Sequence, residues 1–506
     1  MKFNWRKNNK PVLTNYEGEK AFSISKEMEL YTAVVTSTLE NKFNESGGDR
    51  LERIQGLIYD VSPEFVAKLA VYAREQMNLR SIPLVLAVEL TKIHNGDDLV
   101  RKMVKRVIGR ADEITEILAY YQMSNGRDGT KKLNKLSRQF QKGIADAFNK
   151  FDGYQFAKYN RKAEVSLKDA LFLVHPKAKN ETQQVLFNQI AQDELVAPYT
   201  WEVELSNIGQ GTYASEAAKQ SAKKEKWQEL IMSGRLGYMA LMRNLRNILQ
   251  AKVAVEVMDR VVEILGDEQK VRRSRQLPFR FLAAYQEIAS IQSSDTGKLL
   301  EALERAIGFS AANIQGFGAS EHVVIACDVS GSMWSPISRR SCIQNYDIGL
   351  LLGMILQNRV EKVTTGLFGD RWKAYSLPKQ NILANVERLK KLEGEVGYST
   401  NGYKVIQYLL KKRLKVDKVM MFTDCQMWNS RGDGTHIQDV WKHYKQRIAP
   451  EAKLYLFDLA GYGNTPLDLK EGDVHLIAGW SDKVFEVMEG LRKGEKALNM
   501  INKIDL

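Results

Sequence analysis

The sequence predicts a protein of two parts, an all-helical region over residues 15–318 and an α/β region over residues 319–506 with a doubly wound, mostly parallel sheet. Three observations predict this fold class. The 506 residues exceed the size of about 250–300 residues at which single hydrophobic cores stop growing. Apolar residues recur at helical spacing in the first part. In the second part, short apolar runs alternate with amphipathic helices.

Helical spacing of apolar residues fills the first part from residue 25 to residue 309. In the segment 131–148, for example, Leu136, Phe140 and Ile144 fall on one stripe that would face a core. Such segments in series predict paired helices stacked as in a HEAT-like repeat protein. The other predicted helices cover residues 63–77, 83–93, 99–108, 114–121, 181–195, 238–249, 253–265, 279–291 and 298–307.

The pattern changes at Glu321, where a short apolar run ends in the polar loop that begins at Asp328. Sheets of the predicted kind gather ligands at the carboxyl ends of their strands. Gly316 to Gly318 are expected to link the two parts. Further strands are predicted at residues 363–368, 373–377 (an edge strand), 418–423, 453–458 and 474–477, and helices at 343–357, 382–392, 402–414, 436–447 and 484–491.

Composition narrows the class of protein. Apolar residues at 44% and charged residues at 27% are typical of a folded soluble protein. No apolar run is long enough for a membrane span, so we expect a soluble, unexported chain. Three cysteines without C-x-x-C spacing favour the cytoplasm, and six scattered histidines offer no zinc motif. A net charge of +13 favours an anionic partner such as nucleic acid.

Oxygen-bearing side chains follow two of the predicted strands. Asp328, Ser330 and Ser332 form a D-x-S-x-S loop after the first strand, and Asp424 ends the strand 418–423. Thr400 lies in a loop that precedes a helix. Carboxylate and hydroxyl oxygens are ligands for a hard cation, and Mg²⁺ is the divalent cation that we expect. The alternative is a fold that keeps this loop but binds no metal.

These five residues resemble, in type, order and separation, the metal-ion-dependent adhesion site of von Willebrand A domains. The resemblance implies direct contacts to the cation from Ser330, Ser332 and Thr400, with Asp328 and Asp424 acting mainly through water. It also implies an open position for an acidic group or a phosphate. Cys327 and Cys425 flank the two aspartates, and we interpret them as small buried strand residues. Because no hydrolase, P-loop, zincin or dinucleotide motif is found, we predict that the chain is not an enzyme.

Basic residues recur at helical spacing in the first part. They form three groups, namely Lys102, Arg106 and Arg110; Lys131, Lys135, Arg138 and Lys142; and Lys270, Arg272, Arg273, Arg275 and Arg280. Lysine and arginine on a surface neutralise phosphates and bind nucleic acid without regard to sequence. A solvated helix face is the usual alternative for any one such group. Three groups together favour an RNA-binding face.

Several strings resemble the TROVE module shared by telomerase-associated, Ro and vault proteins. They are residues 227–249 (WQELIMSGRLGYMALMRNLRNIL), 277–285 (LPFRFLAAY), 156–159 (FAKY) and 171–177 (LFLVHPK). The resemblance extends over about residues 15–318, and a TROVE module followed by a von Willebrand A domain is the order found in Ro proteins, including bacterial or phage Ro-like proteins. It implies a closed ring of helical repeats with a basic central hole, within a monomer.

The resemblance also implies partners. Ro proteins bind Y RNAs, a class of structured noncoding RNA, on the outer surface and take single-stranded 3′ ends of misfolded RNA through the hole. A role in RNA quality control with an exoribonuclease such as polynucleotide phosphorylase follows from the same likeness. Family contacts to Y RNA fall on Lys158 and Lys162, where the family commonly has arginine, and on His175, while another histidine position holds Leu167. His175 could equally be a packing or capping residue before Pro176.

Two arginines of the motif at 238–249 have two possible roles. Arg243 and Arg246 either face a partner or hydrogen-bond to helix carbonyl groups, and we favour the structural role. The sequence as a whole predicts a non-catalytic Ro-type RNA-binding protein. The alternative is a metal-dependent protein-interaction scaffold that binds no RNA.

Overall fold

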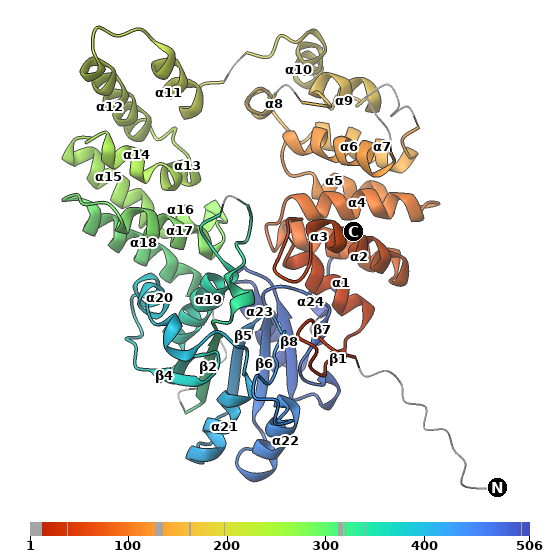
Figure 1. The fold of residues 1–506 in the computed structure, drawn as a ribbon. Coiled ribbons are helices and arrows are strands. Elements are labelled where there is room, and N and C mark those ends of the chain that lie inside the picture. The colour runs from red at the N-terminus through yellow and green to blue at the C-terminus, as the bar shows by residue number, and fades with distance from the viewer. Residues whose placement is uncertain are drawn as a thin grey trace. The chain divides into compact units, whose positions relative to one another are not determined.

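The computed structural model describes residues 13–37, 39–126, 135–160, 163–196, 198–311, 317–318, 320–339, 341–496 and 498–506 (Figure 1). The chain divides into two compact units. One unit comprises Met1–Leu57 with Ser310–Asn499, and the other Ile58–Phe309 with Met500–Leu506. The first 57 residues thus belong to the α/β unit, although they precede the helical unit in the sequence.

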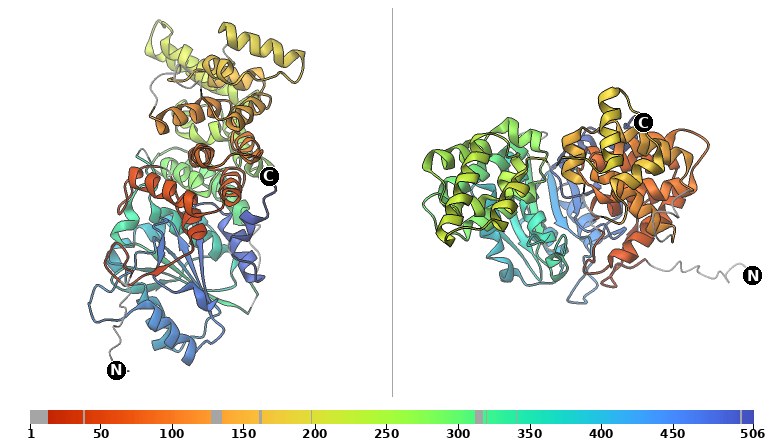
Figure 2. Two further views of the ribbon diagram at one scale, coloured as in Figure 1. Left: turned by 90° about the vertical axis from the view of Figure 1, so that its right-hand side faces the viewer. Right: turned by 90° about the horizontal axis from the view of Figure 1, so that it is seen from above.

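The α/β unit contains a six-stranded sheet in the order β4-β3-β2-β5-β6-β8 (Figures 1 and 2). All neighbouring strands are parallel except β3 and β4, so the predicted doubly wound, mostly parallel sheet is confirmed, and the predicted edge strand β4 is antiparallel to its neighbour. The strands are β2 (His322–Asp328), β3 (Lys362–Phe368), β4 (Trp372–Tyr375), β5 (Lys418–Thr423), β6 (Lys453–Asp458) and β8 (Val474–Ala478).

Alternate residues of each strand point to opposite faces of this sheet. On one face, Val324 and Met421 share a buried cluster with residues of α21 (Tyr403–Lys412) and α22 (Ile437–Arg447). On the other face lies α19 (Asn345–Arg359), where Gly353 approaches so closely that an added Cβ would lie 3.0 Å from the sulfur of Cys327. The remaining helices of this unit are α20 (Ile382–Lys390) and α23 (Val484–Arg492), while the short α24 (Asn499–Asn502) begins at the boundary and falls mostly in the helical unit.

The N-terminal segment packs into the α/β unit. Helix α1 (Lys26–Val35) contacts β8, and the buried Tyr31 donates a hydrogen bond of 3.0 Å to the carbonyl oxygen of Ala478. The short strand β1 (Phe22–Ser23) pairs with β7 (Asn464–Thr465). These pairings join residues more than 400 positions apart, and no local pattern in the sequence predicts them. Helix α2 (Gly47–Asp60) follows α1.

The helical unit is a series of helices, each packed against helices near it in the chain. The predicted all-helical region is confirmed. Its elements are α3 (Pro63–Glu75), α4 (Ser81–Ile93), α5 (Leu99–Val107), α6 (Asp112–Ser124), α7 (Arg138–Phe148), α8 (Gly153–Tyr159), α9 (Leu167–Val174), α10 (Glu181–Gln192), α11 (Trp201–Gln210), α12 (Glu216–Met232), α13 (Tyr238–Arg243), α14 (Leu245–Gln250), α15 (Val255–Leu265), α16 (Glu268–Ser274), α17 (Pro278–Ala289) and α18 (Thr296–Ala311). In the described part of the chain, no helix is long and apolar enough to cross a bilayer.

Two helix predictions were wrong in detail. The single helix expected over 238–249 is broken at Asn244, whose side-chain amide donates a hydrogen bond of 2.8 Å to the carbonyl oxygen of Ala240. An asparagine that bonds its own backbone competes with the helix. The helix expected over 131–148 begins only at Arg138, because Lys135 to Ser137 are not helical. The earlier residues of that prediction, Lys131 included, lie outside the described residues.

Candidate functional site

Three loops meet at the carboxyl edge of the sheet in the α/β unit. Asp328 ends β2, and Asp424 follows the adjacent parallel strand β5. The loop of Thr400 joins them through the backbone, since Gly331 N–H donates to Tyr398 O at 3.0 Å and Trp428 N–H donates to Thr400 O at 3.3 Å. All three predicted loops are therefore tied directly to one another.

The two carboxylates differ in how they are satisfied. Asp328 accepts hydrogen bonds from the Ser330 N–H (2.9 Å) and the Thr423 hydroxyl (2.7 Å). Asp424 accepts one from the Gln426 N–H (3.0 Å), but its Oδ2 is buried and has no hydrogen-bond partner within the described residues. A buried oxygen without a partner is costly, and a cation or a water at this position would satisfy it.

The hydroxyl groups complete the cluster. The Oγ atoms of Ser330 and Ser332 lie 3.3 Å apart. Ser330, Ser332 and Thr400 are each at most 5% exposed. Among the described residues, no group of three or more His, Cys, Asp or Glu side chains could hold a metal ion. A cation at this edge would therefore depend on hydroxyl oxygens as well as carboxylates.

Electrostatics at this edge favour a positive ligand. Burial raises the pKa of Asp328 to about 7, and the negative charge of Asp424 contributes to the same rise. Burial also raises the pKa of Asp424. Two buried carboxylates that repel each other, beside three hydroxyls, are a donor set that fits a hard divalent cation.

The cysteines beside these aspartates are not arranged for chemistry. Cys327 and Cys425 are buried, and burial raises the pKa of both thiols above the usual range. A neutral buried thiol is a poor nucleophile. Both are buried as predicted, but only Cys327 lies in a strand, because β5 ends at Thr423 and Cys425 follows it in the loop.

An N-terminal turn also lies against this edge, and the sequence reasoning missed it. The side-chain amide of Asn15 donates to Met427 O at 2.7 Å, and the Tyr16 N–H donates to Gln426 Oε1 at 2.9 Å. The turn thus supports the loop that follows Asp424. Glu17, on the same turn, has a pKa raised by partial burial and by the charge of Asp424.

In the helical unit, the predicted basic residues of α5 and its flank carry acidic partners. Lys102 pairs with Asp98 at 3.2 Å. Arg106 forms two contacts with Glu75, the shorter of 2.6 Å, and Arg110 pairs with Asp112 at 2.9 Å. Much of the positive charge expected here is therefore compensated. Helical spacing could not show this, because Glu75 comes from another helix.

The basic residues at the start of α7 differ from those of α5. Lys135, Arg138 and Lys142 are exposed. None of these three side chains forms an ion pair with another residue that the structure describes. We call these three residues the α7 cations. They present uncompensated positive charge to solvent.

The residues that correspond to Y RNA contacts of the family lie near α8 and α9. Lys158 Nζ lies 5.8 Å from the ring centres of both Tyr154 and Tyr159. His175 caps α9 in a left-handed conformation (φ 47°), and its side chain is exposed. The backbone of His175 therefore caps the helix, while its side chain is exposed to solvent. Lys162 lies outside the described residues, and Leu167 is buried.

The third basic group, on α16, is partly compensated. Arg272 pairs with Glu268 at 2.8 Å. Arg273 and Arg275 are exposed and form no ion pair with other described residues, and Arg275 ends the helix at φ 50°. Lys270 is partly buried.

A series of packed helices together with a doubly wound sheet, whose carboxyl edge bears two aspartates and three hydroxyls, defines a helical-repeat protein with a von Willebrand A-like unit. Comparison with protein families identifies both parts. The TROVE domain matches residues 25–203 and 194–313, more than half of the chain, and the Ro60 vWA domain matches residues 322–491. The chain belongs to the TROVE family, as a Ro-type member with a C-terminal vWA domain.

Individual proteins agree with this assignment. Telomerase protein component 1 of Mus musculus is 25% identical over 362 residues, which cover 56% of this chain and 14% of that protein. The Rattus norvegicus protein of the same name is 24% identical over 299 residues, or 46% of this chain and 11% of that one. The chain thus spans a small part of these relatives. Neither matched domain family is catalytic, and the absence of enzymatic activity stays a prediction.

A solved structure shares the fold. The crystal structure of the Deinococcus radiodurans RO (RSR) protein matches with a TM-score of 0.59 at 18% sequence identity. The match covers 93% of this chain and 100% of that one.

Proposed function

We propose that this Ro-type protein binds RNA through its helical unit. The observation that supports this most directly is the set of α7 cations, Lys135, Arg138 and Lys142, which are exposed without acidic partners among the described residues of a TROVE domain. Uncompensated lysine and arginine attract phosphates and release counterions on binding. The net charge of +13 acts in the same direction over long range.

The finer proposal names the RNA. Y-RNA-like noncoding RNA and misfolded RNA with single-stranded 3′ ends are the ligands that we propose, in RNA quality control with an exoribonuclease such as polynucleotide phosphorylase. The exposed His175 and the partly buried Lys158 beside two tyrosines support contacts to such RNA. Lysine supplies charge at position 158 but lacks the two parallel donors of arginine.

A gel shift with charge-matched variants tests this function. The full chain is titrated against a structured RNA with a single-stranded 3′ tail, at several salt concentrations. Reversing all three α7 cations (K135E, R138E, K142E) is expected to weaken binding at least about tenfold and to reduce the salt dependence, because phosphate contacts are lost.

The control reverses three cations that already have acidic partners. Lys168 pairs with Asp193, Arg260 with Glu263, and Lys298 with Asp259. The change in net charge is the same in both variants. Equal loss of binding in both would show a net-charge effect only, and failure of the wild-type chain to bind RNA at low salt would contradict the proposed function.

The proposal includes a divalent cation, Mg²⁺, at the edge of the sheet. Ser330, Ser332 and Thr400 would hold it, with Asp328 and Asp424 balancing its charge, and the unpartnered Oδ2 of Asp424 supports this. Once bound, such a cation offers a coordination position to an acidic group. The same site favours a second candidate function, in which the vWA domain docks a protein partner through the cation. The stability of the metal-free protein as a function of pH tests the cation.

A further inference from the structure

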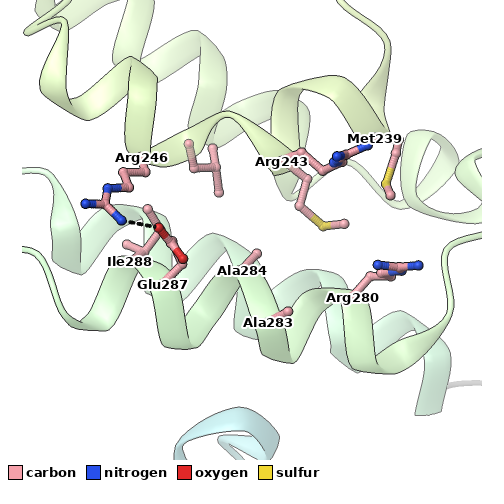
Figure 3. Close-up of a pocket in the computed structure, with 10 residues that line it drawn as sticks. Met239, Arg243, Arg246, Arg280, Ala283, Ala284, Glu287 and Ile288 are labelled. Carbon is pink, nitrogen blue, oxygen red and sulfur yellow. Dashed lines mark hydrogen bonds and ion pairs between the residues drawn. The ribbon is translucent and has the colours of Figure 1, made fainter. Parts of the chain in front are cut away.

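Helices α13, α14 and α17 line an open cavity of about 240 Å³ in the helical unit. The two longest strings of the family resemblance meet here, since residues 238–249 form one wall and residues 277–285 contribute to the other. Figure 3 shows the guanidinium groups of Arg243 and Arg280 at one end of this cavity. At the other end, Arg246 pairs with Glu287 at 2.8 Å.

The first of these ends carries two positive charges without a counterion. Neither Arg243 nor Arg280 donates a side-chain hydrogen bond or forms an ion pair within the described residues. Glu287, the acid among the lining residues, is already paired with Arg246. Arg243 and Arg280 are both exposed, and desolvation by neighbouring atoms together with the positive charge of Arg243 lowers the pKa of Arg280. An anion placed between the two guanidinium groups would relieve this repulsion.

No ion pair or hydrogen bond to another described residue occupies the guanidinium groups of Arg243 and Arg280. Arg74 and Arg101 of the same unit are neutralised at close range, by Glu113 (3.0 Å) and Asp146 (2.7 Å), whereas Arg280 lies over the ring of Phe279, 5.0 Å from its centre. The sequence favoured a bond from Arg243 to a helix carbonyl, and the described residues show no such bond. The positive end of the cavity is therefore available to a ligand.

We propose that this cavity binds one nucleotide, with its phosphate between Arg243 and Arg280 and its sugar or base against the apolar wall. Arginine presents paired N–H donors that match two phosphate oxygens. Ala283 and Ala284 line the cavity between its two charged ends, and Met239 lies beside Arg243. A thioether and small apolar side chains accept the flat face of a base without specifying it.

The volume of the cavity, about 240 Å³, far exceeds the ~10–15 Å³ that one water requires, so a ligand much larger than water can enter. Ala283 and Ala284 leave this space open, and a larger side chain at either position would fill it without changing the charge. The inference rests on the proposed RNA binding, and the ligand is a nucleotide of single-stranded RNA. A free nucleoside monophosphate shares the same chemistry, so the test separates the two.

The test measures binding of a fluorescent single-stranded 12-nucleotide RNA to the full chain by anisotropy. R243Q and R280Q are each expected to weaken binding about fivefold to tenfold, because a charge-assisted contact to phosphate is lost. A284L is expected to weaken it similarly by filling the cavity. The matched control, R260Q, removes an equal charge from α15, outside the cavity, and is expected to change binding less than twofold.

Three further measurements decide the interpretation. Melting temperatures of R243Q and R280Q should not fall, because removal of one of two repelling charges does not destabilise the fold. Titration with adenosine monophosphate, adenosine and inorganic phosphate shows whether a free nucleotide suffices. Loss of nucleotide or RNA binding in R280Q but not in R260Q supports the inference. Equal binding by R280Q and R260Q, or no binding of either ligand by the wild-type chain, would overturn it.

These outcomes remain distinct from the test of the α7 cations. If reversal of Lys135, Arg138 and Lys142 abolishes RNA binding while R243Q, R280Q and A284L bind like R260Q, the inference fails and the proposed function stands. If the wild-type chain binds no RNA but binds the mononucleotide in an Arg280-dependent manner, the proposed function fails and the cavity is a nucleotide site.

Discussion

At the residue scale, Asp328 and Asp424 determine what the edge of the sheet can bind. Both are 1% exposed, and burial raises the pKa of each, to about 7 for Asp328. In the folded chain, Asp328 therefore keeps a proton at pH values where the unfolded chain, with a pKa near 3.8, has released it. Such a group lowers stability as pH rises from about 4 to about 7. Each unit by which the pKa differs between the folded and the unfolded chain changes the free energy of unfolding by at most about 1.4 kcal/mol.

This sign gives a prediction for metal-free protein. In the presence of a chelator, the melting temperature is expected to be several degrees lower at pH 8 than at pH 5.5, and added Mg²⁺ should recover stability mainly at pH 8, where both carboxylates are ionised. D424N removes the repelling charge and one ligand, so it should reduce the pH dependence and abolish the effect of Mg²⁺. Scanning calorimetry from pH 5 to pH 8.5 measures all three.

Because other groups titrate in the same pH range, the test depends on the difference between the wild type and D424N. Asp458 is also buried, and its pKa is raised to about 6. The charge of Asp424 is one cause of this rise, so D424N should also lower the pKa of Asp458, and both groups contribute to the reduced pH dependence of that variant. D439N, at an exposed position of α22, is the control and should behave as wild type. A response to Mg²⁺ in D424N equal to that of wild type would contradict the proposed site.

The sequence predicts that the residues of the proposed metal site lie close together, but it does not show which basic residues are paired with acids. Asp328 and Asp424 each follow a strand, and parallel strands place such loops at one edge. The positive charge of Arg106, by contrast, is compensated by Glu75, which lies in α3, 31 residues earlier in the chain. Spacing within one helix identifies a face but does not show which of its charges are paired with acids of other helices, as Arg106 is with Glu75. The bond from Arg243 to a helix carbonyl that the sequence favours is not found among the described residues.

At the element scale, close packing of helices depends on a glycine. Helices α5 and α7 pack against each other, and Gly143 of α7 lies where a Cβ atom would come within 2.7 Å of the Val104 Cβ and 2.9 Å of the Arg101 carbonyl oxygen. Backbone cannot move aside as a flexible side chain can. The α5–α7 contact therefore requires this glycine, and it also positions the helix that bears Arg138 and Lys142.

A pair of glycine substitutions tests this packing. Gly143→Ala is expected to destabilise the helical unit by about 1–3 kcal/mol, because an extra methyl group overfills a packed contact. Gly308→Ala, in α18 with no atom within 4 Å of the added Cβ, should stabilise by about 0.5–1 kcal/mol, because alanine loses less backbone entropy in a helix. Calorimetric melting of the full chain compares them. Equal effects of the two substitutions would contradict the packing argument.

The sequence predicts helices and strands correctly where apolar residues repeat at one clear spacing. It fails where a side chain interrupts the backbone hydrogen bonds or where distant segments pair. Strands β5 and β6 have the bounds that the apolar runs gave them. The helix expected over 238–249 is interrupted at Asn244, whose side-chain amide donates a hydrogen bond to the carbonyl oxygen of Ala240. The spacing of apolar residues carries no information about this hydrogen bond. Strands β1 and β7 have only two residues each, too short for any period, and exist because distant segments pair.

At the scale of the whole molecule, the two structural units do not follow one another in the sequence. Residues 13–57 precede the helical unit but contribute to the α/β unit through buried contacts. Arg50, which is 1% exposed, pairs with Glu45 at 2.5 Å and donates to Ala460 O at 2.6 Å. Lys42 donates to the same carbonyl oxygen. A boundary drawn from periodicity alone cannot find such contacts, because helices in both units have the same spacing.

This grouping predicts where a core substitution acts. Leu30 in α1 is fully buried, so Leu30→Ala is expected to cost about 2–5 kcal/mol in the unit to which it belongs. Hydrogen exchange of the full chain should then rise in β6 and β8, more than 400 residues away, and change little in α3 and α4, which follow it in the sequence. Leu69→Ala in α3 is the matched control, with the same substitution at a fully buried leucine. It should raise exchange in α3, α4 and α5 and leave β6 and β8 protected. If Leu30→Ala instead exposes α3 and α4 first, α1 belongs energetically to the helical unit, and the division into units at residue 57 is incorrect.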